Sequence, residues 1–129
     1  MRTRNTDKEE LVKQTAIKML VSDGFEGFSV NRLAKACDIS VATLYIYYKD
    51  KEDLITRIAI EEGQRRNERT LADFDPEMPF AAGLRKQWEN RFRYHVENPD
   101  AMLFFEQLRS SPYHDKVFEQ IMELEDKLS

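Results

Sequence analysis

Helix-breaking residues are scarce in this sequence. Four glycines and four prolines occur in 129 residues, and no segment alternates apolar and polar residues as a half-buried β-strand does. Apolar residues recur instead at intervals of three and four positions, which is the spacing of one helix face. The sequence therefore predicts an all-α fold.

Cap signals place the first helices. Thr6 and Glu9 form a capping box that starts a helix over about 7–23, which Gly24 ends. Further N-cap residues precede three more helices, namely Ser29 before 30–37, Ser40 before 41–47 and Asp50 before 51–72. The helices over 30–37 and 41–47, joined by a tight turn, predict a helix-turn-helix arrangement.

A connection over 73–79, with two prolines and no helical period, precedes three further helices. We expect one domain over 1–51, and a linking helix with a partial second helical domain over 52–129. The helix near 102–108 is apolar nearly all round and is expected to be buried. The apolar residues expected to face inward are Phe80, Leu84, Trp88, Phe92, His95 and Val96 on the fifth helix, and Val117, Phe118, Ile121, Met122 and Leu128 on the last.

The net charge of -4 is unevenly distributed along the chain. Residues 1–51 carry nine Lys and Arg against seven Asp and Glu, a net charge of +2. Residues 52–129 carry eleven against seventeen, a net charge of -6. This asymmetry favours an N-terminal unit that faces nucleic acid, attached to an acidic body.

Several classes of protein do not fit the sequence. No apolar run approaches the roughly 20 residues of a membrane span, and the first ten residues lack the apolar region of a secretory signal, so we expect a cytoplasmic protein without a membrane partner. Cys37 is the single cysteine, which excludes an internal disulfide. His95 and His114 have no partners at metal-ligand spacing, and neither a nucleophile motif nor a phosphate-binding loop is present. We therefore expect no metal, no cofactor and no catalysis.

Three tyrosines lie within four positions of the stretch SVATLYIYYKDKEDL. Helical spacing turns Leu44 and Tyr48 toward the core and leaves Tyr45 and Tyr47 facing elsewhere. The small residues that open this helix would let it approach base edges in the major groove of DNA, and phenol hydroxyls beside Lys51 can contact phosphates. Spacing alone equally fits a tyrosine-rich local core with a solvated lysine rim.

The run FSVNRLAKACDISVATLYIYYKDKEDL, residues 28–54, resembles the DNA-binding domain of the TetR/AcrR family of bacterial helix-turn-helix transcriptional regulators. The resemblance includes a serine opening the second helix, two alanines inside it, an Ile-Ser pair, the runs Thr-Leu-Tyr and Tyr-Tyr, and Lys-Glu-Asp-Leu. Cys37 and Asp38 depart from the small residue and glycine usual at the turn, and Tyr48 stands where phenylalanine is commonest. Asp38 can adopt the left-handed conformation that the turn requires.

The resemblance implies a role for each matching position. Phosphate contacts would fall on Thr43, Tyr47 and Lys51. Arg2 and Arg4 would form either a flexible arm that contacts phosphates or a solvated start of the chain. The remaining candidates are Val41, Ala42 and Tyr45 near base edges and Asn31 at the groove wall.

The resemblance also implies a ligand-binding and dimerisation domain after the fourth helix, with the helices usual for dimerisation missing beyond Ser129. The expected function is that of a ligand-responsive repressor, a homodimer that binds a palindromic operator on double-stranded DNA and responds to a small apolar effector. The alternative is a helical protein-interaction module that has lost DNA binding, which Asp38 and the net negative charge support. Candidate pocket residues, which packing alone would also explain, are Trp88, Phe92, His95, Phe104, Phe105, Tyr113, Phe118 and Met122.

Overall fold

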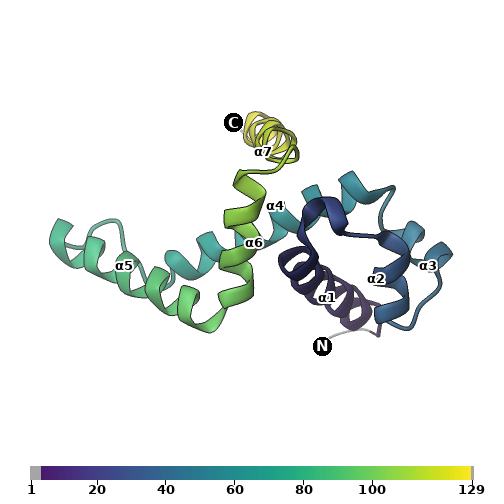
Figure 1. Cartoon of the computed structure of the whole chain (residues 1–129). Helices are drawn as coiled ribbons and strands as arrows, with labels where there is room; N and C mark the ends of the chain where they lie inside the picture. Colours follow the sequence, from purple (N-terminus) through teal and green to yellow (C-terminus); the bar gives the residue numbers. More distant parts are fainter. Residues whose placement is uncertain (1–3, 129) are drawn as a thin grey trace.

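The computed structural model describes residues 4–128, and within this range the chain forms seven helices and no strand (Figure 1). The all-α prediction is confirmed, although the first helix begins earlier than the capping box indicates. No helix in this range combines the length and the apolarity that a membrane crossing requires. In chain order the helices are α1 (Arg4–Gly27), α2 (Val30–Ala36), α3 (Val41–Tyr47), α4 (Lys51–Thr70), α5 (Phe80–Glu97), α6 (Pro99–Arg109) and α7 (His114–Leu128).

One hydrophobic core joins α1, α2 and α3 to the start of α4. Leu20 of α1, Leu33 of α2 and Leu44 of α3 are all fully buried in it. The first turns of α4 enter the same core through Leu54 and Ile58. α4 continues from this core to its packing contact with α5, and the same core also includes Phe104 of α6 and Val117 of α7.

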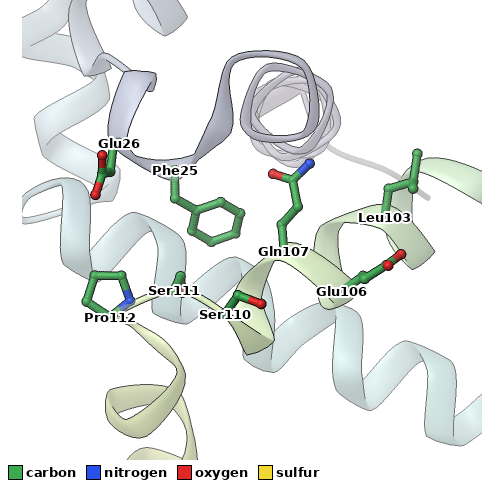
Figure 2. A pocket seen from close by; sticks show the side chains of 8 residues that line it. All are labelled: Phe25, Glu26, Leu103, Glu106, Gln107, Ser110, Ser111 and Pro112. Carbon is green, nitrogen blue, oxygen red and sulfur yellow. The ribbon is translucent and has the colours of Figure 1, made fainter.

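The end of α1 bends at Gly24, whose φ of 79° lies in the left-handed region that favours glycine. The bend places Phe25 against Phe104 of α6, with ring centroids 5.6 Å apart. Figure 2 shows Phe25 and Gln107 directed into the hollow between the two helices, and the Gln107 amide donates to the carbonyl of Val21 over 3.0 Å. A ring contact and a long-range hydrogen bond therefore hold α6 against α1.

A buried polar network joins α1, α4 and α5. Glu62 of α4 is 2% exposed, and its Oε1 lies 3.3 Å from Nζ of Lys13 on α1. The buried Tyr94 of α5 donates its hydroxyl to Glu62 Oε2 over 3.4 Å. Burial, followed by the charge of Glu62, raises the pKa of Tyr94 to about 12. Nearer the start of α5, Asn90 donates to the carbonyl of Thr70, where α4 ends.

The apolar stripe of α5 is not buried, so this part of the sequence-based prediction is wrong. Trp88 is 67% exposed and stacks on the exposed Phe92 with ring centroids 5.8 Å apart. The helix instead turns Asn90 and Tyr94 toward α4, and it extends away from the other helices (Figure 1). Within residues 4–128 no helix covers the opposite side, where the exposed residues are Phe80, Leu84, Trp88, Phe92 and Val96.

The last two helices also expose apolar side chains. Leu103 is 45% exposed, so α6 is not buried on all sides as predicted. On α7, Val117 is buried against the core, but Phe118, Ile121 and Met122 are exposed, contrary to the expected inward stripe. The side chain of Leu128 lies outside the described part of the chain. Helical spacing thus identifies residues that share a face without revealing whether that face has a partner.

Candidate nucleic-acid interface

Two serine caps define the helix-turn-helix segment, and both are the N-caps that the sequence predicts. Ser29 Oγ accepts a hydrogen bond from the backbone N–H of Arg32 at 3.3 Å, and Ser40 Oγ accepts one from Thr43 at 3.0 Å. The two hydroxyls of Ser40 and Thr43 are also 2.8 Å apart. The first turn of α3 is therefore held by both backbone and side-chain bonds.

The turn between α2 and α3 contains Asp38 in the left-handed conformation, with φ of 55°, as the sequence predicts. Its N–H donates to the carbonyl of Lys35, and the N–H of Ile39 donates to Ala34, which satisfies carbonyls at the end of α2. Cys37 is buried beside this turn, and burial raises the pKa of its thiol. The turn is thus built without the glycine usual for the family.

α3 presents one side to the core and the other to solvent. Leu44 is fully buried and Tyr48 nearly so, which confirms that these two face inward. Burial raises the pKa of the Tyr48 hydroxyl to about 12. On the outer side Tyr45 is 49% exposed and Ile46 is 80% exposed. In Figure 1 this helix lies at the opposite end of the molecule from α5.

The outer side of α3 includes a residue that the sequence reasoning missed. Ala42, Tyr45 and Ile46 occupy positions i, i+3 and i+4 of one helix face, and all three are exposed. The same period that turned Leu44 inward could have identified Ile46. Together these side chains form a small apolar surface, which we call the α3 tip.

The start of α4 carries the lysine that the resemblance assigns to phosphate. Asp50 caps this helix by accepting from the N–H of Asp53 over 2.8 Å, and Asp53 Oδ2 accepts from the N–H of Lys49 over 2.9 Å. These bonds order the connection between α3 and α4. Lys51 Nζ lies 5.9 Å from the ring centroid of Phe28, and no ion pair between described residues engages it. Its charge is therefore open to an external anion.

Arg57 holds the end of α3 against α4, a role that the sequence reasoning also missed. Its guanidinium donates to the carbonyl of Tyr47 and lies 5.0 Å from the ring centroid of Tyr48. It is also 3.9 Å from Asp53 Oδ2. The Tyr47 carbonyl belongs to the last turn of α3, where the helix cannot satisfy it internally. The spacing of four between Asp53 and Arg57 was the available signal.

The other residues assigned to DNA contact lie on α2, on α3 and in the first four positions of the sequence. Asp38 is exposed beside them and adds a negative charge. Arg2 lies outside the described residues, and only the backbone of Arg4, at the start of α1, is described. Asn31 is exposed on α2, whereas Val41, Thr43 and Tyr47 are half-buried on α3. Their roles in DNA contact stay predictions.

The eight residues expected to line a ligand pocket do not surround one cavity. Phe105 and Phe118 share a groove of about 200 Å³ between α4, α6 and α7. Of the other six expected pocket residues, Trp88, Phe92 and His95 lie on α5, Phe104 and Tyr113 pack on Phe25, and Met122 is exposed on α7.

Among the described side chains, no cluster of His, Cys, Asp and Glu could hold a metal ion.

Comparison with known proteins identifies this arrangement. The family described as bacterial regulatory proteins, tetR family, matches residues 12–58, which include the capped α2, the turn and α3. A solved TetR family transcription regulator from Marinobacter aquaeolei is 28% identical, with a TM-score of 0.80 over 98% of this chain and 69% of that chain. Over residues 12–58 the chain resembles the tetR family, and its fold matches that of a TetR-family regulator. The resemblance found in the sequence is therefore confirmed.

Two relatives differ in how much of their length this chain matches. An HTH-type transcriptional regulator of Haemophilus influenzae is 26% identical over 94% of this chain and 65% of its own length. The HTH-type transcriptional regulator YuxN of Bacillus subtilis is 41% identical over 38% of this chain and 17% of its own length. These relatives are named as transcriptional regulators and not as enzymes, in line with the expectation from the sequence.

Proposed function

We propose that this chain regulates transcription by binding double-stranded DNA through α3. The observation that supports the proposal is the α3 tip, an exposed apolar surface on a short helix whose first turn is held by Ser40. A helix fits the major groove of B-DNA, which is about 12 Å wide. An exposed isoleucine and tyrosine on such a helix have no partner within the described residues, and base edges would cover them.

Different residues would carry sequence preference and affinity. Val41, Ala42 and Tyr45 would meet base edges, with readout that is partly apolar because methyl groups can contact thymine methyls. Thr43, Tyr47 and Lys51 would contact phosphates, which fix the position of the helix without reading sequence. Asn31 would lie at the groove wall. Ile46 joins the base-edge group because it lies on the α3 tip.

The assembly that fits this function is a homodimer on a palindromic operator, acting as a repressor that responds to a small ligand. Half-sites would then lie about 34 to 36 Å apart, one helical turn, or a small multiple of that distance. The match of residues 12–58 to the tetR family supports this assembly, and the exposed apolar sides of α5 and α7 offer surface for association.

Fluorescence anisotropy with labelled duplexes, selected from a random-sequence library, tests the proposal. Lys51→Ala should weaken binding to all sequences alike and reduce the salt slope by about 1, whereas Ala42→Gln should change which sequence is preferred. Arg85→Ala is the matched control, because it removes an exposed cation from α5. Binding that no salt concentration weakens, or equal effects of all three substitutions, would contradict the assignment.

The second candidate function is protein association without DNA binding. The exposed stripe on α5, including the stacked Trp88 and Phe92, favours it because stripes of this kind commonly mark interaction surfaces. Salt dependence separates the two functions. DNA affinity falls steeply as salt rises because counterions are released, whereas association through an apolar face does not.

A further inference from the structure

One arginine of α4 differs from the others in how its charge is balanced. Arg57, Arg65 and Arg69 each have a carboxylate oxygen between 3.1 and 3.9 Å away. Arg66 has no carboxylate within ion-pair distance among the described residues. Its guanidinium lies instead over the ring of Phe105, 4.2 Å from the centroid. The Arg66 guanidinium is therefore positively charged, packs on an aromatic ring and has no paired carboxylate.

Arg66 lines the groove of about 200 Å³ between α4, α6 and α7. The charged and titratable residues of that lining are Arg66, Arg109 and His114, and none of the lining residues is acidic. The His114 ring of this lining pairs with Asp115, whose Oδ1 lies 3.5 Å from His114 Nδ1 and whose side chain is 95% exposed. Burial, together with Arg91 and Arg109, lowers the pKa of Arg66, which agrees with a cation in a site that lacks anions.

The rest of the groove is apolar. Leu108 and Val117 are buried beneath it, and Phe105, Phe118 and Ile121 line its sides. A ligand that fits must therefore combine an anionic head with an apolar body. The volume lies below the usual range of roughly 300 to 1,000 Å³ for drug-sized ligands, so the body is small.

We propose that this groove binds a small amphipathic carboxylate, whose head pairs with Arg66 and whose apolar chain lies along Phe105 and Phe118. The planar guanidinium matches a carboxylate through two parallel hydrogen bonds. Arg66 is the half-buried arginine of the lining, whereas Arg109 is exposed to solvent. One half-buried arginine balances one negative charge, which favours a carboxylate over a phosphate, whose charge is about -1.5 to -2. The role of this ligand as the effector rests on the proposed function in DNA binding. The proposed ligand differs from the small apolar effector expected from the sequence because it carries an acidic head.

Isothermal titration calorimetry of the chain with sodium octanoate tests the site directly. 1-Octanol, octylammonium chloride and octyl phosphate serve as probes with the same tail and a neutral, cationic or phosphate head. We expect octanoate to bind at least about tenfold more tightly than 1-octanol, since a hydrogen bond to a charged group is worth that much or more. Octylammonium should not bind, and octyl phosphate should bind more weakly than octanoate.

Arg66→Gln should weaken octanoate binding about ten- to a hundredfold, because the charge is lost while a polar side chain of similar length remains. Arg66→Lys keeps the charge but not the planar guanidinium, so its affinity for octanoate should lie between that of the unmodified chain and that of Arg66→Gln. Arg69→Gln is the matched control, because it removes an arginine one turn away that pairs with Glu97. Circular dichroism confirms that each variant keeps its helical content.

Three results would overturn the proposal. Octanoate that binds Arg66→Gln as tightly as the unmodified chain would be adsorbing on exposed apolar faces such as that of α5. Equal affinity for 1-octanol would exclude a role for charge, and tighter binding of octyl phosphate would identify a phosphate site. DNA anisotropy is measured in parallel, so if the unmodified chain binds DNA but does not bind octanoate, the ligand site alone is refuted. If the unmodified chain binds octanoate but not DNA, the proposed function alone is refuted.

Discussion

Replacing Lys13 removes the main counter-charge of a buried carboxylate. Glu62 Oε1 lies 3.3 Å from Lys13 Nζ and 3.9 Å from an Arg65 nitrogen, and it accepts no well-directed hydrogen bond. The Lys13 side chain is only 12% exposed and Glu62 is 2% exposed, so water screens this pair poorly. In Lys13→Met, Glu62 keeps a negative charge in a buried position with a more distant cation. The substitution should therefore destabilise the fold strongly.

The structure sets the size of the effect. At the observed 3.3 Å, the attraction is about 5 kcal/mol for an effective dielectric constant of 20. Breaking a buried pair typically costs about 3 to 5 kcal/mol, and the remaining Arg65 lowers the expected loss in Lys13→Met to about 2 to 4 kcal/mol. Glu62→Gln should cost only about 1 kcal/mol, because its amide oxygen still accepts from Tyr94. Lys13 then also keeps its contact with Glu10, 3.3 Å away.

Urea denaturation followed by circular dichroism at pH 7 measures these free energies of unfolding, provided that the slope against urea is unchanged. The decisive variant is Lys13→Met combined with Glu62→Gln. It should be more stable than Lys13→Met alone, because no unpaired charge stays buried. Lys18→Met is the control, since it removes an exposed lysine of α1. If Lys13→Met loses less than about 0.5 kcal/mol, or the two substitutions simply add, the pair does not act as described.

Three further substitutions follow from the structure. Asp38→Gly should stabilise the fold by about 0.5 kcal/mol in urea denaturation, because glycine suits the left-handed φ of 55°, and should tighten DNA binding by removing a negative charge. The pKa values of Tyr48 and Tyr94 are higher in the folded chain than in the unfolded chain, so their contribution to stability should be full below about pH 10 and be lost between pH 10 and 12. Urea denaturation at a series of pH values should show a flatter decline for Tyr94→Phe. Trp88→Glu should change stability by less than about 0.5 kcal/mol but reduce self-association in sedimentation, because Trp88 is exposed.

Local signals predicted the helix-turn-helix region well. The caps at Ser29 and Ser40, the bend of α1 at Gly24, where the sequence predicts a helix end, and the inward faces of Leu44 and Tyr48 all follow from bonds or spacings within a few residues. Such features depend on the backbone of one segment, which the sequence determines almost alone.

The parts that sequence reasoning missed depend on which helices meet. The Tyr94 hydroxyl and Glu62 are 32 positions apart, and no period in either helix indicates that they pair. Trp88 lies in an ideal inward stripe, yet the face of α5 that packs on α4 carries Tyr94 instead. Arg66 is one of four arginines in α4, and only the arrangement of α4, α6 and α7 leaves it without a carboxylate.

The helix α6 takes part in both the proposed ligand groove and the contact with α1. Phe105 supports Arg66 in the groove, while Gln107 bonds to the carbonyl of Val21 on α1. A ligand that repositions α6 would therefore act on the helix that shares its core with α3. Binding can alter DNA affinity only if the ligand prefers one of two arrangements of α6 and α1, and DNA must then alter ligand affinity by the same factor. Such coupling would pass through α6 and its hydrogen bond to the carbonyl of Val21.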